Sequence, residues 1–268
     1  MCDVDLPTVL EDPVKDTAAS WLGDQIRGWG AVLPFFLGFL MVRSALADPY
    51  YIPSGSMQPT LEIGDRVLVN KSAYGLRYPL TRVPVGSLEV PERGDVVVFV
   101  KPGTDHREDG SQGWGYWLDV GLPLGPSLHG VAYIKRVVGL PGEVIEVRRG
   151  VVYIDGKPQH RDAPVPVTVA DRRCSVDSLL SSQEALGGAA HDVLHAPAYG
   201  APDFGPEVVS ADHVFVMGDN RDRSADSRSW GLVPLRNVKG RADRIIWSLD
   251  PCREPVAGIR SDRFWHPL

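Results

Sequence analysis

Cysteine is scarce in this sequence, with only Cys2, Cys174 and Cys252 among its 268 residues. None of them stands in a Cys-x-x-Cys pattern, so a zinc site built from cysteines is not expected. Cys174 and Cys252 could pair in an oxidising compartment. Their separation matches no disulfide framework, however, and two free thiols fit the sequence at least as well, so both states stay open.

An excess of positive charge is also absent. The 28 lysine and arginine residues stand against 34 aspartate and glutamate residues, for a net charge of −6, which excludes the basic footprint of a nucleic-acid-binding protein. The seven histidines form no local nucleophile motif, so a Ser-His-Asp enzyme is not expected. His191 and His195 stand four residues apart without a third ligand. We expect both to be exposed loop residues, and the sequence predicts no metal site and no cofactor.

One long hydrophobic run is present near the N-terminus. Residues 28–47 read GWGAVLPFFLGFLMVRSALA, which matches the roughly 20 residues that span a bilayer. Trp29 lies at one end, where aromatic belts form, and Arg43 lies near the other, where it can snorkel to the interface. The sequence therefore predicts a single transmembrane helix over 28–47, preceded by an N-terminal tail at 1–27.

A cleavable signal peptide is the competing interpretation of this run. Ala45-Leu46-Ala47 resembles a small-x-small cleavage site after a short apolar core. The region before the run is acidic, with only Lys15 and Arg27 as cations, whereas the first part of a signal peptide is positively charged. We favour a retained anchor, whose orientation the flanking charges do not decide.

The rest of the chain, residues 48–268, reads as a mainly β catalytic domain. The 28 glycines and 23 prolines indicate many turns. The unbroken apolar run at 96–100 is typical of a buried strand, and the segments 144–147 and 151–154 flank a turn and predict a hairpin. Further strands are expected at 62–70, 131–138, 213–217 and 242–249. Residues 102–130 and 159–210 show weak periodicity and are interpreted as insertions, the second as a small lobe.

Two neighbouring cations occupy the expected strand at 131–138. Alternate residues of a strand share a face, so Lys135 and Arg136 each point to an apolar face. Arginine does not give up its proton in proteins, so only Lys135 can act as a base. Burial favours this, because desolvation lowers a lysine pKa by up to about 3–5 units in extreme cases. In the alternative interpretation, both are snorkelling cations at the edge of a sheet.

A serine-rich turn and four further blocks carry a family resemblance. The chain resembles bacterial type I signal peptidases, which are membrane-bound Ser/Lys endopeptidases that cut signal peptides from exported proteins. The blocks occur in the family's order and are Ser54-Gly55-Ser56-Met57-Gln58-Pro59-Thr60-Leu61, Gly64-Asp65-Arg66-Val67-Leu68-Val69, Arg93-Gly94-Asp95-Val96-Val97-Val98-Phe99, the segment from Tyr133 to Gly142, and the segment from Gly218 to Arg228.

The resemblance implies roles for several residues. Ser56 is implied as the nucleophile and Lys135 as the general base, with the N–H of Ser56 and the hydroxyl of Ser54 as the oxyanion hole. Ser224 is implied to orient the lysine. The implied loop support is Gly218, packed beside the lysine, and the Asp226–Arg228 salt bridge. The implied walls of small apolar pockets for alanine at the −1 and −3 positions are Ile52, Met57, Leu61, Tyr133 and Ile134.

The resemblance also implies partners and a location. The expected partners are exported preproteins and membrane lipid. The expected location is the bacterial inner membrane, crossed once, with the catalytic domain on the outer side. The chain departs from the family at Arg223, where asparagine is common, and it has no counterpart of the family's small disulfide. Two alternatives are a specialised Ser/Lys processing peptidase of the same fold and a non-catalytic membrane-tethered binding domain.

Overall fold

The computed structural model describes residues 30, 32, 34–36, 38, 39, 46–78, 84–102, 132–171, 173–196, 202–254 and 256–268. The chain divides into two compact units, Met1–Val42 and Arg43–Leu268. The described residues of the first unit are helical. Within the described residues, the structure has no helix with the length and apolarity that a membrane crossing requires. The expected tail at 1–27, most of the expected helix at 28–47 and nearly all of the insertion at 102–130 lie outside the described residues.

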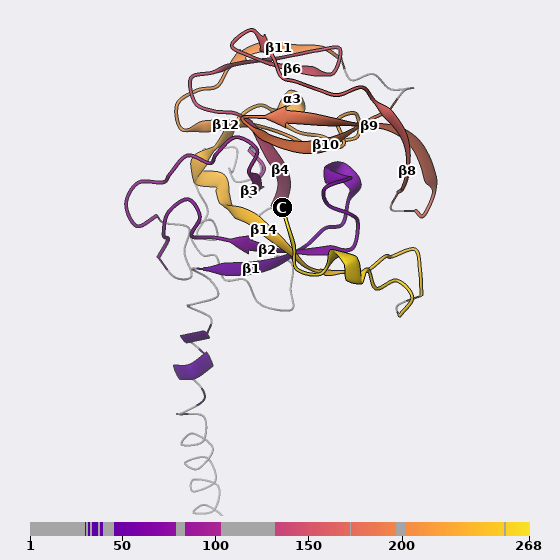
Figure 1. Ribbon diagram of the computed structural model, residues 1–268. Helices are drawn as coiled ribbons and strands as arrows, with labels where there is room; N and C mark the ends of the chain where they lie inside the picture. Colours follow the sequence, from indigo (N-terminus) through magenta and orange to yellow (C-terminus); the bar gives the residue numbers. More distant parts are fainter. Residues whose placement is uncertain are drawn as a thin grey trace, which may run out of the picture. The chain divides into compact units, whose positions relative to one another are not determined.

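The second unit is mainly β, as expected, and its largest sheet has eight strands (Figure 1). Its strand order is β1-β2-β14-β3-β4-β12-β13, with β15 paired to β14, and every pairing is antiparallel. The strands are β1 (Ala47–Tyr51), β2 (Asp65–Asn70), β3 (Val96–Val100), β4 (Ala132–Gly139), β12 (His213–Met217), β13 (Val233–Pro234), β14 (Val238–Ser248) and β15 (His266–Pro267). The strand β1 begins at Ala47, the last residue expected in the transmembrane helix.

The central strand β3 shows why this sheet is stable. All five of its residues are buried, as the unbroken apolar run predicts. Val98 packs into a cluster with Val67 and Ile245, whereas Phe99 packs into a second cluster with residues of β12 and β13. Because alternate residues point to opposite faces, the sheet buries apolar surface on both sides. The neighbouring strand β4 is therefore held between two cores.

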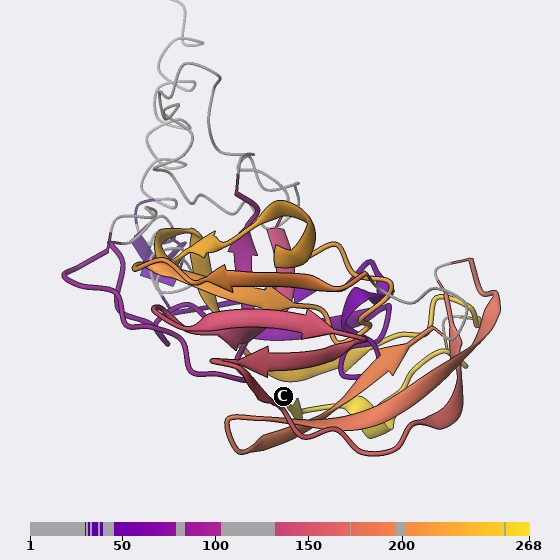
Figure 2. The ribbon, with the colours of Figure 1, turned by 90° about the horizontal axis from the view of Figure 1, so that it is seen from above.

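Two smaller sheets contain much of the remaining chain (Figure 2). A four-stranded sheet has the order β11-β5-β6-β7, and a three-stranded sheet has the order β10-β9-β8. Their strands are β5 (Val144–Arg148), β6 (Val151–Ile154), β7 (Lys157–Pro158), β8 (Val165–Ala170), β9 (Val176–Leu186), β10 (Ala189–His195) and β11 (Phe204–Val208). The hairpin predicted at 144–154 corresponds to β5 and β6, which pair in antiparallel register.

The region 159–210 is more regular than its sequence indicated. Its longest strand, β9, has eleven residues and pairs along its length with β8 and β10. The buried positions of β9 include Ser182 and Glu184 alongside Leu179 and Leu186. Polar residues at inward positions remove the apolar alternation that marks a half-buried strand. The sequence pattern therefore did not indicate this sheet. Contacts of Glu184 with the rest of the domain hold it in place.

A disulfide joins Cys174, in the loop between β8 and β9, to Cys252, which follows β14. The sequence left this pairing open, because 78 residues separate the two cysteines. The second unit has only short helical turns among its described residues. They are the 3-10 turns η1 (Gly55–Met57), η2 (Leu235–Asn237) and η3 (Ser261–Arg263) and the four-residue helix α3 (Ser227–Trp230).

Candidate active site

Ser56 lies in the middle of the 3-10 turn η1, in the segment that joins β1 to β2. The turn is closed by the N–H of Gln58, which donates to Gly55 O at 3.2 Å. Met57 and Leu61 follow on the same segment and have no exposed surface. Their burial anchors the turn to the sheet and leaves Ser56, which lies between Gly55 and Met57, partly exposed.

Lys135 reaches this serine from the central strand β4. Its Nζ lies 2.7 Å from Ser56 Oγ and donates to the backbone oxygen of Ile134 at 2.8 Å. The residue is 2% exposed. Burial lowers the pKa of Lys135 to about 8, against an opposing effect of the Asp226 and Asp219 carboxylates. A lysine with this pKa is partly neutral near pH 7 and can accept a proton from the serine hydroxyl.

The loop after β12 contributes Gly218, Ser224, Asp226 and Arg228. Asp226 accepts hydrogen bonds from the N–H of Gly218 at 3.0 Å and from the Arg228 guanidinium at 2.8 Å, and it caps the N-terminus of α3. Burial by itself would raise the pKa of Asp226, but Arg228 and the Gly218 N–H hold it below its ordinary value. The carboxylate therefore stays ionised and fixes the shape of the loop.

Gly218 lies at the closest approach between this loop and the serine. A Cβ added to it would lie 2.2 Å from Ser224 Oγ and 2.4 Å from the backbone oxygen of Ser56. Contacts this short cannot form without displacing backbone. Glycine is therefore required here by the distance between the two loops, because the nearest atoms to an added Cβ belong to Ser224 and Ser56.

Ser224 and Ser54 lie close to the dyad but make no interaction that identifies a role. The hydroxyl of Ser224 is buried and faces Asp226, whose pKa it helps to hold down. Lysine Nζ is instead bonded to Ser56 and to the backbone of Ile134. Ser54 is exposed, occupies the N-cap position of η1 and makes no capping hydrogen bond. The exposed Ser54 hydroxyl is thus available for a contact that substrate would complete.

A groove of about 340 Å³ adjoins the serine and the lysine. Of the expected pocket residues, Ile52, Tyr133 and Ile134 line it. Met57 and Leu61 do not, since they lie in the core cluster against which Ile134 packs. The full lining is Tyr50, Tyr51, Ile52, Pro53, Ser54, Ser56, Val98, Ala132, Tyr133, Ile134, Lys135, Arg223 and Ala225. The groove is small and mainly apolar, which suits short aliphatic side chains.

Asn220 is a site residue to which sequence reasoning gave no role. Its side-chain amide donates to Gly55 O at 3.0 Å, and its backbone N–H donates to Ser56 O at 3.2 Å. Two hydrogen bonds therefore connect the loop after β12 to the turn that carries the serine. Asn220 belongs to the block from Gly218 to Arg228, but nothing in its local spacing indicates contacts across 165 residues of sequence.

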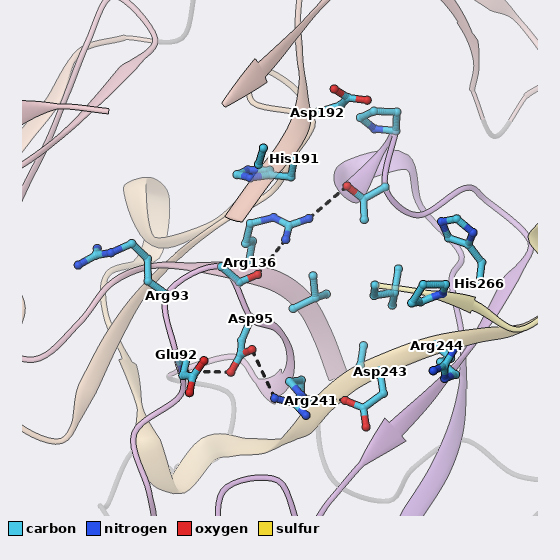
Figure 3. A pocket seen from close by; sticks show the side chains of 18 of the residues that line it. Glu92, Arg93, Asp95, Arg136, His191, Asp192, Arg241, Asp243, Arg244 and His266 are labelled. Atoms are coloured by element: carbon cyan, nitrogen blue, oxygen red, sulfur yellow. Dashed lines mark hydrogen bonds and ion pairs between the residues drawn. The ribbon is translucent and has the colours of Figure 1, made fainter. Parts of the chain in front are cut away.

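The opposite face of β4 is organised around Arg136. Its guanidinium donates to both carboxylate oxygens of Asp219, at 2.8 and 2.7 Å, and to Thr60 Oγ1 at 3.2 Å. Figure 3 shows Arg136 on the wall of a polar cavity of about 830 Å³, which is larger than the groove but contains neither Ser56 nor Lys135. The pairing with Asp219 ties β4 to the loop after β12 from the side away from the serine.

His191 lines the same cavity (Figure 3) and is not the exposed loop residue expected from the sequence. It lies on β10, and its side chain is 7% exposed. Burial, assisted by the Arg136 charge, lowers the pKa of His191 to about 4. His195 is also mostly buried on β10. The described part of the chain has no group of three or more His, Cys, Asp or Glu side chains that could hold an ion.

The three-stranded sheet supports the catalytic loop directly. In β10, the N–H of Leu194 donates to Asp219 O and the N–H of Arg221 donates to Leu194 O, at 2.8 and 2.9 Å. The Arg221 guanidinium also forms a buried ion pair with Glu184 of β9. The lobe expected as an insertion is therefore part of the framework that holds residues 218–228.

Comparison with known proteins gives a consistent result. The family model for "Signal peptidase, peptidase S26" matches residues 26–247. The signal peptidase I of Pseudomonas aeruginosa is 35% identical over 90% of this chain and 77% of its own length. That of Haemophilus influenzae is 32% identical over 88% of this chain and 73% of its own.

A solved signal peptidase I from Enterococcus faecalis V583 covers 58% of this chain and 98% of its own, with 22% identity and a TM-score of 0.31. The assignment therefore depends on the sequences, which match over most of the chain. By these relationships, the chain belongs to the signal peptidase family, peptidase S26, and is a serine endopeptidase.

Proposed function

We propose that this protein cleaves signal peptides from exported preproteins with a dyad of Ser56 and Lys135. One observation carries the proposal. Lys135 Nζ lies 2.7 Å from Ser56 Oγ and is almost fully buried, which lowers its pKa to about 8. A nucleophile and a base within hydrogen-bond distance are the minimum required for acyl transfer at a serine.

The reaction follows from the properties of these two groups. Neutral Lys135 takes the hydroxyl proton as Ser56 Oγ attacks the carbonyl carbon of the scissile peptide. The resulting ammonium then protonates the leaving amine, and the C–N bond breaks to give an ester on Ser56. Lys135, neutral again, takes a proton from water as the water attacks the ester, and it returns that proton to Ser56 Oγ as the C–O bond breaks. This step releases the new carboxyl group, which ionises in solution, and restores both the serine and the neutral lysine.

The developing oxyanion needs donors on the opposite side of the carbonyl carbon. The N–H of Ser56 and the hydroxyl of Ser54 are assigned this function, because both belong to η1 or its N-cap and the Ser54 hydroxyl caps no backbone group. Preorganised donors of this kind each contribute about 100- to 1000-fold in rate. Ser224 is assigned to orient the lysine when it is protonated, because its buried hydroxyl lies in the loop that packs against the backbone of Ser56.

Substrate selection is assigned to the groove beside the dyad. Ile52, Tyr133 and Ile134 leave a space of about 340 Å³, and the core residues beneath them cannot move apart without losing packing. We assign the preference for alanine-sized side chains at the −1 and −3 positions to these bulky walls. Cleavage after Ala-x-Ala follows from this proposal.

The proposed location is the outer side of the bacterial inner membrane, with residues 28–47 as the single anchor. The disulfide between Cys174 and Cys252 supports placement of the catalytic domain outside the cytoplasm, since disulfides persist in oxidising compartments. Under this proposal, the first unit of the chain contributes anchoring and brings the enzyme to preproteins at the membrane.

The test uses the full-length detergent-solubilised protein and a preprotein that carries Ala-x-Ala before its mature sequence. We expect one cut directly after the second alanine, located by mass spectrometry of both products. Ser56→Ala should leave the preprotein intact, and a preprotein with phenylalanine at −1 should not be cut. Efficient cleavage after phenylalanine or lysine, or cleavage by the Ser56→Ala variant, would contradict the proposal. Cutting confined to one dedicated substrate would instead favour the specialised processing peptidase.

A further inference from the structure

The groove beside the dyad contains a permanent positive charge. Among the residues that line it in the described structure, only Lys135 and Arg223 carry ionisable cationic side chains. Lys135 must lose its charge to act as a base, whereas an arginine keeps its charge at every relevant pH. A mainly apolar groove with one fixed cation discriminates between substrates by charge as well as by size.

The position of Arg223 is fixed by contacts on both sides. Its N–H donates to the backbone oxygen of Asn220 at 3.1 Å, and Asn220 in turn is bonded to the turn that carries Ser56. On the other side, Arg223 Nη1 donates to Asp177 of β9 at 2.5 Å. The backbone of Arg223 is thus tied to the turn that carries the nucleophile, and its guanidinium is directed toward Asp177.

Asp177 belongs to a segment that is itself attached to the domain at two points. The disulfide of Cys174 lies three residues before it. In the strand paired with β9, the backbone oxygen of Ala170 accepts a hydrogen bond of 3.1 Å from the side chain of Gln58, two residues after the nucleophile. The carboxylate that partners Arg223 therefore has a defined place beside that residue, although Asp177 itself does not line the groove.

The Arg223–Asp177 pair is still accessible to a substrate. The Arg223 side chain is 34% exposed and that of Asp177 is 35% exposed. One guanidinium nitrogen is bonded to Asp177, and arginine offers five N–H donors in a planar arrangement. A substrate carboxylate can bind the remaining donors with charge-assisted hydrogen bonds, while a substrate lysine or arginine meets a like charge.

We propose that Arg223 is a specificity-determining residue, which favours preproteins with an aspartate or glutamate over those with a lysine or arginine at one position of the segment bound in the groove. This inference rests on the proposed cleavage of signal peptides. Asp177 partly neutralises the guanidinium, so it moderates the preference. The two residues therefore have opposite effects on the same selectivity.

The test measures kcat/KM for a set of peptides that contain Ala-x-Ala. Aspartate or lysine replaces one residue at a time at each position outside the two alanines. For the wild-type enzyme, the Asp/Lys ratio should exceed one at a single position by up to about fivefold, the size expected for a solvent-accessible charge pair. Added salt should shrink the ratio, because it screens exposed charges.

Four variants separate selectivity from structural support. Arg223→Asn should bring the ratio close to one, and Arg223→Glu should invert it. Asp177→Asn should raise the ratio, because it leaves the guanidinium without its partner. Arg148→Glu is the matched control, since Arg148 is an exposed arginine paired with Glu146 on β5, outside the groove, and it should leave the ratio unchanged.

The outcomes are distinguishable. If Arg223→Asn and Asp177→Asn slow all peptides equally and leave every ratio unchanged, the pair only supports the loop and the inference is wrong. A change of ratio in Arg148→Glu as large as in Arg223→Glu would also overturn it. If the wild-type enzyme does not cut the parent Ala-x-Ala peptide, the proposed function fails, whereas normal cutting with ratios of one contradicts only the role of Arg223.

Discussion

The two faces of β4 place neighbouring cations in opposite environments. On one face, Lys135 is bonded to a serine hydroxyl and a backbone oxygen, and no carboxylate touches its Nζ among the described residues. On the other face, Arg136 is bonded to both oxygens of Asp219. A buried cation with an ion-pair partner keeps its charge, whereas a buried cation without one is under pressure to lose its proton. The paired Arg136 therefore supports the scaffold, and the unpaired Lys135 supports catalysis.

The two faces of β4 should differ most in their effect on activity. Lys135→Arg keeps the charge but removes the base, because a guanidinium has no lone pair to accept the Ser56 proton. We expect a loss of about 100- to 10 000-fold in kcat/KM on a preprotein, the usual contribution of a general base. The matched variant Arg136→Lys keeps the charge on the other face. Its activity per folded molecule should stay close to that of the wild type. Near-normal turnover by Lys135→Arg would show that Lys135 is not the base.

Arg136→Met tests how much the Arg136–Asp219 pair contributes to the stability of the fold. This substitution leaves the Asp219 carboxylate, which has no exposed surface, without its main partner. The free energy of unfolding should fall by about 3–5 kcal/mol, the usual cost of breaking a buried pair on one side. Chemical denaturation at pH 7 measures this. A loss below 1 kcal/mol, within the range of exposed ion pairs, would show that Asp219 does not depend on Arg136.

A substitution of Lys135, on the other face of β4, should change the free energy of unfolding in the opposite direction. Below pH 8 the folded protein bears the cost of a charged Lys135 in a desolvated site, because its pKa falls from 10.5 to about 8 on folding. Lys135→Met should therefore raise the free energy of unfolding by about 3 kcal/mol at pH 7. The difference should shrink as the pH rises from 8 to 10.5. A gain that is independent of pH would attribute the effect to packing instead of charge.

The smallest expected effect concerns His191, which lies beside the Arg136–Asp219 pair. Its pKa falls from 6.5 to about 4 on folding, so unfolded chains take up a proton first as the pH drops below 6.5. Wild-type stability should then decrease relative to His191→Leu, by about 1 kcal/mol at pH 5.5. Urea titrations of both proteins at pH 7.5 and 5.5 measure the difference. An equal pH dependence in the two would show that His191 is not a buried neutral imidazole.

Local patterns predicted the central strands well. The apolar runs gave β3 and β12 at their observed bounds, 96–100 and 213–217. The alternation of side chains also placed Lys135 and Arg136 on opposite faces, and the contacts of each confirm it. Such features depend on residues within one strand, which a sequence displays directly.

Contacts between distant segments were not predictable in the same way. The disulfide joins residues 78 apart, and Asn220 contacts Gly55 across 165 residues. Glu184 is buried because Arg221 neutralises it, and without that knowledge β9 reads as a polar insertion. The same reason explains His191, whose neighbours come from β4 and the loop after β12. Polar burial requires partners, and a sequence does not show which distant residues become partners.

The proposed catalysis depends most on the neutral form of Lys135 as the base. The dependence of kcat/KM on pH for wild-type enzyme and preprotein tests it most directly, because this quantity follows the ionisation of the free enzyme. We predict an increase toward alkaline pH with a midpoint close to pH 8, the pKa that burial gives Lys135, and the same midpoint for Arg136→Lys. A flat profile, or a midpoint near the ordinary histidine pKa of about 6.5, would contradict the assignment of Lys135 as the base.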